Sequence, residues 1–138
     1  MLSKNLLLFI SFIALITASS CKKDLNNREQ NLIDIQLLLP TSKTDTVNVN
    51  DSIRFSVISY ANITYYRDLE KFKVNLSSTN GGQNGDIIGV QISDADKKKY
   101  RFDRFIKVGN VKGNQVYTFI VRDVSGEEAR VSYPVVVK

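Results

Sequence analysis

The densest group of side chains with binding chemistry lies in residues 97–107, which read Lys-Lys-Lys-Tyr-Arg-Phe-Asp-Arg-Phe-Ile-Lys. Basic groups bind anions and aromatic rings stack against flat ligand surfaces, so this interleaving is typical of sites for acidic polymers. It predicts ligand contacts at Lys97, Lys98, Lys99 and Arg101. The same pattern also fits the edge strand of a sheet, where lysines prevent pairing with other molecules and alternate aromatic side chains enter the core.

Three tyrosines form a second candidate contact group, namely Tyr60, Tyr65 and Tyr66. We expect them in or beside a loop that joins two strands, because loops at the end of a sandwich carry recognition and Tyr is a low-entropy contact residue. Carbohydrate sites use aromatic platforms of this kind, although the sequence contains no Trp. The alternative is partial burial of the rings, and rings that face the core would contradict the contact hypothesis.

The residue types on which most catalytic and metal sites depend are scarce. The sequence has no His and one Cys, which excludes zinc sites built from these residues, Ser-His-Asp triads and Cys-His pairs. A glycosidase needs only two carboxylates across a cleft, but no paired pattern is present. We therefore expect no enzymatic activity and no cofactor, and a small hydrolase is a remote alternative.

Three aspartates could supply oxygen ligands to a calcium ion, namely Asp94, Asp96 and Asp123, yet their spacing is not that of an EF-hand. We expect the Asp123 carboxylate to accept hydrogen bonds within its own turn, which leads to Gly126. The sequence therefore predicts no metal site.

The first 20 residues have the pattern of a secretory signal peptide. Lys4 gives a positive start, residues 6–16 form an apolar run, and the small residues 17–20 precede Cys21. A transmembrane helix needs about 20 apolar residues, so the run is too short for a permanent span. We expect residues 6–17 to form an isolated helix that export removes. An uncleaved membrane anchor is the alternative.

The segment Ala18-Ser-Ser-Cys21 resembles the lipobox of bacterial lipoproteins, in which the cysteine thiol receives a diacylglyceryl group. The family pattern prefers Leu where this chain has Ala18. The next residues, Cys21-Lys-Lys-Asp24, resemble the start of lipoproteins from Bacteroidetes, whose charged residues here are associated with export to the cell surface. The resemblance implies lipidation at Cys21 and an outer-membrane location with surface exposure. An ordinary secreted protein with a terminal Cys is the alternative.

Residues 21–31 are mostly polar, and we expect them to form a flexible tether after the lipidated Cys. From residue 32 onward, apolar and polar residues alternate with the period of two that indicates β-strands. The alternation covers 33–39, 47–49, 53–57, 72–76, 88–92, 102–108, 117–121 and 131–137. Segments 77–85 and 109–114, rich in Gly and Asn, predict turns. Residues 67–73 and 93–99 could each form one helical turn.

The number and spacing of these strands favour one all-β domain over residues 32–138, folded as an antiparallel sandwich. The closing segment, with a strand, the turn Asp123-Val-Ser-Gly126 and the last strand Val131–Val137, resembles the end of bacterial immunoglobulin-like domains. Val47–Ile53 resembles the entry into their second strand. The resemblance implies an immunoglobulin-like β-sandwich of about seven strands. It implies no particular function, because this fold hosts many roles.

The formal net charge of +5 favours acidic surfaces such as anionic glycans or lipid headgroups. Together, these features predict a non-catalytic, lipid-anchored module that presents its sandwich to a protein partner, as an accessory of a larger outer-membrane complex. A glycan-binding lipoprotein that uses the tyrosines and the basic stretch is the alternative. We expect no nucleic acid as a partner, because a domain outside the cytoplasm rarely meets it.

Overall fold

The computed structural model of the chain describes residues 33–61 and 67–138. These residues form eight β-strands: β1 (Ile33–Leu39), β2 (Asp45–Val47), β3 (Ser52–Ala61), β4 (Leu69–Ser78), β5 (Gly85–Gln91), β6 (Lys99–Lys107), β7 (Gly113–Asp123) and β8 (Glu128–Val137). The predicted signal peptide, the lipidation site Cys21 and the tether lie outside the described residues, as do Tyr65 and Tyr66. In the described part of the chain, no helix has the length and hydropathy that a membrane crossing requires.

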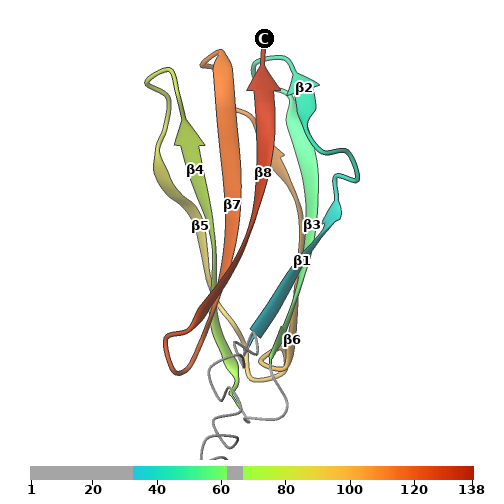
Figure 1. The fold of residues 1–138 in the computed structure, drawn as a ribbon, viewed down its shortest axis with the longest axis vertical. Coiled ribbons are helices and arrows are strands. Elements are labelled where there is room, and N and C mark those ends of the chain that lie inside the picture. The colour runs from blue at the N-terminus through green and yellow to red at the C-terminus, as the bar shows by residue number, and fades with distance from the viewer. Residues whose placement is uncertain (1–32, 62–66) are drawn as a thin grey trace, which may run out of the picture. The chain divides into compact units, whose positions relative to one another are not determined.

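The strands form two sheets that pack face to face (Figure 1). The first sheet has three strands in the order β1-β3-β6, and the second has five in the order β2-β8-β7-β4-β5. Neighbouring strands are antiparallel, except that β2 runs parallel to β8. The β4–β5 and β7–β8 connections stay within one sheet, and the other connections cross between the sheets. This topology is that of an immunoglobulin-like β-sandwich. It confirms the predicted fold class, with eight strands in place of about seven.

The core follows from the alternation of side chains along each strand. In β7, Tyr117, Phe119 and Val121 are fully buried, while the side chains between them lie on the opposite face of the sheet. The ring of Phe55 in β3 lies 5.1 Å from that of Tyr117 and 5.0 Å from that of Phe119, so it joins the two sheets. Full burial of an aromatic side chain contributes about 1.5–3 kcal/mol. With one Cys in the sequence, the sandwich depends on such packing and on its strand ladder rather than on an intrachain disulfide.

Neither of the two segments in which a helical turn was considered possible forms a helix. Residues 67–73 do not form a helical turn, because Leu69 begins β4, whose residues pair with β5 and β7 on either side. The segment 93–99 forms two successive turns, in which the Asp96 N–H donates to the Ser93 carbonyl and the Lys99 N–H to the Asp96 carbonyl, each at 3.0 Å. These turns connect β5 to β6 across the end of the sandwich. Strand pairing therefore overrides the weak local preference for helix in residues 69–73.

Candidate binding surface

Three of the predicted contact residues lie together on the outer face of the three-stranded sheet. Tyr60 pairs with Lys99, and Ile58, two residues earlier in β3, pairs with Arg101. Directly paired residues of antiparallel strands carry their side chains on the same face of the sheet, so these groups are neighbours. Tyr60 is the penultimate residue of β3, so it lies within the strand and beside the predicted loop. Its side chain is 36% exposed and faces outward.

The same ladder continues along the two strands and brings further groups onto this surface. Beyond Arg101, the pairs are Ser56 with Asp103, Arg54 with Phe105 and Ser52 with Lys107. We call this surface the β3–β6 face; it consists of Arg54, Tyr60, Lys99, Arg101, Asp103, Phe105 and Lys107. Four further groups of this face, Arg54, Asp103, Phe105 and Lys107, were not predicted as contact residues.

Two arginines share one carboxylate at the centre of the β3–β6 face. Arg54 donates to both oxygens of Asp103, from Nε to Oδ1 at 2.8 Å and from Nη2 to Oδ2 at 3.0 Å. The Arg101 guanidinium lies 3.5 Å from the same Oδ2. The hydrogen bonds from Arg54, with the charges of both arginines, hold the pKa of Asp103 below its ordinary value. One negative charge thus orients two positive ones, and the group keeps a net positive charge.

At one end of the face, a lysine lies over an aromatic ring. The Lys99 Nζ is 5.5 Å from the centroid of the Tyr60 ring, within the range of a cation–π contact. At an exposed site such a contact contributes about 0.5–1 kcal/mol. Within the described ranges, Lys99 and Lys107 form no ion pair, so both ends of the face carry an unneutralised cation.

Phe105 is the most exposed aromatic side chain among those described, at 70%. Segment 99–107 is an edge strand, as the alternative interpretation of its sequence predicted, and Tyr100 and Phe102 point toward the core. Phe105 does not follow them, because residues three apart in a strand lie on opposite faces. The odd spacing between Phe102 and Phe105 was the signal in the sequence that could have predicted an exposed ring.

Lys97 and Lys98 are held away from this face by a carboxylate. The Lys97 Nζ lies 3.1 Å from Asp68 Oδ2, and Lys98 pairs with Oδ1 of the same residue. Hydrogen bonds from Lys98 and then Lys97 lower the pKa of Asp68. The backbone reinforces the contact, because the Leu69 N–H donates to the Lys97 carbonyl at 2.7 Å. These two lysines therefore fasten the β5–β6 turn to the start of β4, which gives them a structural role.

Two of the three aspartates considered as calcium ligands, Asp96 and Asp123, accept hydrogen bonds within their own turns. Asp123 Oδ1 accepts hydrogen bonds from the Ser125 N–H at 2.9 Å, the Ser125 hydroxyl at 2.6 Å and the Glu127 N–H at 3.0 Å. This confirms the predicted role of Asp123, while Asp96 accepts a hydrogen bond from the Ser93 hydroxyl at 2.7 Å. Among the described residues, no three His, Cys, Asp or Glu side chains are grouped as metal ligands would be.

The outer face of the five-stranded sheet has a different electrostatic character. Three of its cations lie beside carboxylates. Lys73 is 3.6 Å from Asp86, and Arg122 is 3.7 Å from Glu70. Arg130 lies 2.6 Å from Glu128, two residues earlier in the same strand, β8. Exposed pairs of this kind contribute little to stability, but they balance the charge of the face. The β3–β6 face therefore has the stronger positive charge of the two.

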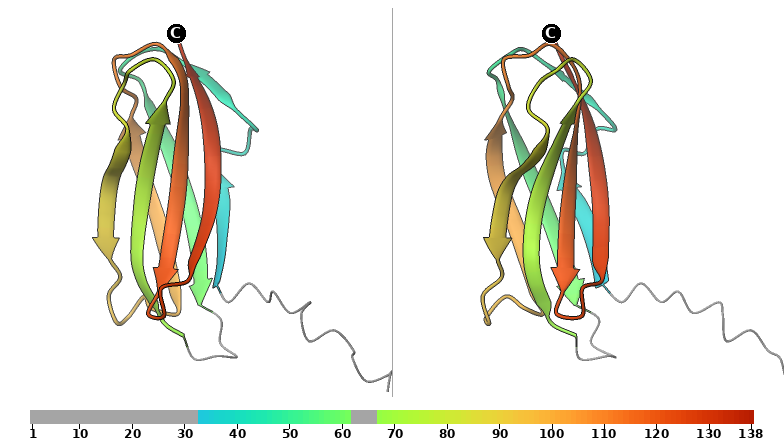
Figure 2. Two further views of the ribbon diagram at one scale, coloured as in Figure 1. Left: turned by 60° about the vertical axis from the view of Figure 1, so that its left-hand side comes forward. Right: turned by 90° about the vertical axis from the view of Figure 1, so that its left-hand side faces the viewer.

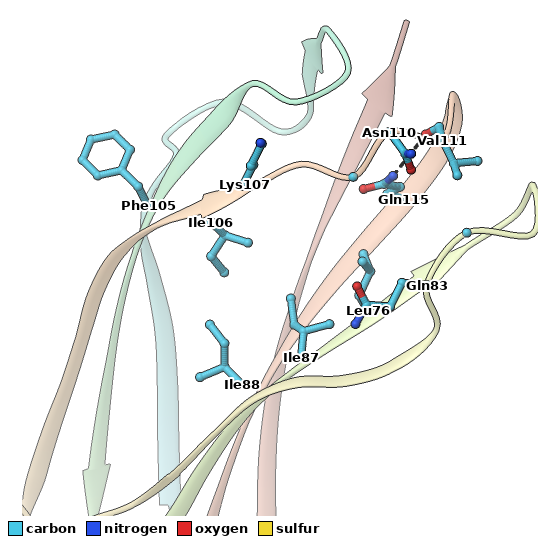
Figure 3. A pocket seen from close by; sticks show the side chains of 12 residues that line it. Leu76, Gln83, Ile87, Ile88, Phe105, Ile106, Lys107, Asn110, Val111 and Gln115 are labelled. Atoms are coloured by element: carbon cyan, nitrogen blue, oxygen red, sulfur yellow. Dashed lines mark hydrogen bonds between the residues drawn. The ribbon is translucent and has the colours of Figure 1, made fainter.

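A pocket of about 400 Å³ opens between the edge strands of the two sheets, β5 and β6. Both views in Figure 2 place these strands along the same side of the sandwich. Ile87, Ile88 and Ile106 point toward one another across the pocket, while Phe105 points away from it (Figure 3). Ile87 is the extra residue of a β-bulge, since Val74 pairs with Ile88 and the next residue pairs with Asp86. The bulge brings two consecutive isoleucines to one side of β5.

Polar groups surround this apolar floor. Gln83, Asn110 and Gln115 contribute amides, and Lys107 is the one charged residue among the described residues that line the pocket. The buried Gln115 is already satisfied, because its Nε2 donates to the Val111 carbonyl at 3.3 Å and its Oε1 accepts from the Tyr117 hydroxyl at 3.1 Å. The pocket can thus accept an apolar group beside a single cation. The pocket was not predicted from the sequence. The consecutive residues Ile87 and Ile88, which interrupt the alternation, were the signal that could have indicated it.

The similarities of this chain to known proteins are confined to solved structures. No family model matches the chain, and no curated protein matches it. Similar solved structures include the fibronectin(III)-like modules of Clostridium thermocellum CbhA, at 13% identity and a TM-score of 0.46, covering 76% of this chain and 97% of that one. A superoxide reductase (neelaredoxin) from Ignicoccus hospitalis has 10% identity and a TM-score of 0.48, with 77% and 80% covered.

A β-glucosidase from Listeria innocua is also similar, at 13% identity and a TM-score of 0.42. That match covers 77% of this chain but 16% of the glucosidase. At these identities and TM-scores, none of the three similarities carries an argument about ligand or activity.

Proposed function

We propose that this domain is a non-catalytic binding module, held at the outer membrane by lipid on Cys21, which binds a protein partner through the β3–β6 face. The observation that carries the proposal is an exposed Phe105 beside a positively charged group of oriented arginines. Aromatic residues and Arg are enriched in protein interfaces, where a ring supplies apolar contact and a guanidinium supplies directed hydrogen bonds.

The shape of the face favours a protein over a sugar chain. Phe105 lies opposite Arg54, and Tyr60 lies six residues after Arg54 in β3. The two rings are therefore about 20 Å apart along the strand. Small-ligand sites are concave and surround most of the ligand. Here the two exposed rings are separated by the Arg54–Asp103–Arg101 group, which suits an extended protein surface. Glycan binding at Tyr60 and Lys99 is the second candidate, supported by their cation–π pair.

The anchoring part of the proposal rests on the sequence, with the lipobox-like Ala18-Ser-Ser-Cys21. The described domain is compatible with anchoring through its N-terminal side. Ile33, its first residue, pairs with Ala61 at the end of β3. Lys107 pairs with Ser52 at the beginning of the same strand. The chain therefore enters at one end of the sandwich, and the pocket beside Lys107 lies at the opposite end. A domain tethered in this way keeps the pocket end accessible to partners.

In-cell crosslinking followed by mass spectrometry tests the proposal on the native lipoprotein. The variants are Cys21→Ala for the anchor and Phe105→Ser for the face. Val124→Ser is the matched control, because it also removes an exposed apolar side chain, 60% exposed, from a distant turn. We expect one specific partner that is lost in the first two variants and retained in the third.

Two results would contradict the proposal. A partner that survives Phe105→Ser removes the β3–β6 face as the binding surface, and a Cys21→Ala protein that stays on the membrane removes the lipid anchor. Retention on immobilised acidic polysaccharide, abolished by Lys99→Ser and unaffected by Phe105→Ser, would establish the glycan alternative instead.

A further inference from the structure

The outer edge of β6 offers unpaired backbone groups in a regular pattern. The Val108 N–H donates to the Asp51 carbonyl at 2.7 Å, and the Lys98 carbonyl accepts from the Ala61 N–H at 3.0 Å, so even-numbered residues turn their peptide groups toward β3. In an antiparallel pair this direction alternates from one residue to the next. The peptide groups of the odd-numbered residues 99–107 therefore face away from β3. In the described part of the chain, no strand pairs with β6 on that side.

The pocket lies beside this free edge. Ile106 contributes its side chain to the pocket floor, and Ile87 and Ile88 contribute theirs from β5 on the other sheet (Figure 3). A strand added to β6 would lie about 4.8 Å from it and would run across the mouth of the pocket. Side chains opposite the even-numbered residues of β6 would point into the sandwich, and the one opposite Ile106 would enter the pocket.

The charges along β6 indicate which side chains a strand added to this edge should carry. The side chains of the odd-numbered residues, on the outer face, are Lys99, Arg101, Asp103, Phe105 and Lys107. Asp103 already carries the hydrogen bonds of Arg54, so the excess along this row is positive. Opposite charges on directly facing residues of neighbouring strands stabilise their pairing, and like charges destabilise it.

We infer that β6 binds an extended acidic segment of a partner protein by strand addition, with one apolar side chain of that segment in the pocket between β5 and β6. The inference rests on the proposed function and names the chemistry of the partner: carboxylates alternate with aliphatic residues. The aliphatic residues face the pocket, and the carboxylates face Lys99, Arg101 and Lys107. The same cations oppose pairing of β6 with a second copy of this chain.

The direct test is amide hydrogen exchange of the full chain with a synthetic peptide of about nine residues that alternates Val and Glu. We expect the amides of residues 99, 101, 103, 105 and 107 to exchange about tenfold more slowly with the peptide bound. Those of Phe102 and Ile106, whose peptide groups face β3, are expected to be slow in both states. A peptide that alternates Val and Lys has the same strand propensity and should leave the exchange rates unchanged.

A pair of variants at the pocket mouth separates charge from backbone pairing. Lys107→Ser removes the cation, whereas Lys107→Pro removes the cation and the outward N–H while leaving the bonds of β6 to β3 intact. We expect the peptide to bind about threefold more weakly to the first variant and at least tenfold more weakly to the second. Equal affinities of the two variants would overturn strand addition. The exchange measurement on the unaltered chain tests the inference even when the proline variant does not fold.

The remaining outcomes are also decisive. Equal binding of the two peptides, or binding of the acidic peptide without slower exchange of the odd-numbered amides, overturns the inference. Concentration-dependent protection of these amides without peptide, together with a dimeric mass in sedimentation, would assign the edge to a second copy. If the peptide fails to bind while the crosslinked partner still depends on Phe105, the inference falls and the proposed function stands. If the peptide binds but no partner depends on Phe105, the proposed function falls.

Discussion

Replacing Phe102 and Phe105 with Ala, one at a time, tests the orientation of β6 on which the β3–β6 face depends. Phe102 is 1% exposed, and its ring lies 5.0 Å from that of Phe72 and 6.0 Å from that of Phe119. Truncation of such a ring leaves a cavity and should lower the free energy of unfolding by about 3–5 kcal/mol.

Phe105 should respond very differently, although it lies three residues further along the same strand. Its side chain is 70% exposed, so less than a third of its surface is buried. Full burial of a Phe side chain contributes about 1.5–3 kcal/mol, and a third of that is about 0.5–1 kcal/mol. Phe105→Ala should therefore lower the free energy of unfolding by no more than about 1 kcal/mol.

Urea unfolding followed by circular dichroism measures both values, with Val124→Ala as a control at an exposed apolar position. A reversed order, with Phe105→Ala the costlier change, would mean that the register of β6 is shifted by one residue, because such a shift exchanges the two faces of a strand. Equal losses would mean that neither face of β6 is buried in preference to the other. Either result would remove Phe105 from the proposed interface.

Four further predictions concern turns, strand propensity and pH. Asp123→Ala removes three hydrogen bonds from the β7–β8 turn and should lower the free energy of unfolding by about 3 kcal/mol. Asp123→Asn keeps an acceptor and should lower this free energy less. Thermal unfolding of the two variants measures the difference. Gly85→Ala should destabilise the fold by about 1–3 kcal/mol because Gly85 has φ +118°. At Gly89 an added Cβ meets open space, so Gly89→Thr should stabilise the fold by up to about 1 kcal/mol. A loss of stability in Gly89→Thr would contradict the position of this residue in the strand. Burial raises the pKa of Tyr117, so the contribution of this side chain to stability is complete below pH about 10 and is lost as the pH rises further. Between pH 10 and 11.5, the urea midpoint should therefore fall less steeply for Tyr117→Phe than for the unaltered chain. Parallel slopes would show that ionisation of Tyr117 does not cause the loss of stability at high pH.

The strands were predictable because their pattern is local. Period-two alternation located seven of the eight strands but placed the short second one at 47–49, whereas β2 is Asp45–Val47. Turn residues marked the boundaries of β4 and β5. The first and last residues of the strands were harder to predict from the sequence. Pairing with neighbouring strands extends β3 to Ala61 and makes residues 69–73 part of β4. Asp123 was also predicted correctly, because a carboxylate that serves its own turn needs no distant partner.

The candidate site was only partly predictable, because it depends on which strands lie side by side. The basic and aromatic stretch identified Lys99 and Arg101, but it grouped them with Lys97 and Lys98, which are held by Asp68. Asp68 precedes β4 and is far from these lysines in the sequence. The contribution of Arg54 was not visible either, because its partner Asp103 lies 49 positions away. No local pattern specifies such a pair.

The sequence by itself determined the fold class, the strand positions and the chemistry that this chain lacks, because alternation, turn residues and missing His are properties of short segments. The tertiary structure alone decided which charges are neutralised and which remain free. It did so by placing β6 at the edge of one sheet and β5 at the edge of the other, with a pocket between them. A period of two tells which residues share a face, but only the order of strands in a sheet tells which faces and edges are left without a neighbour.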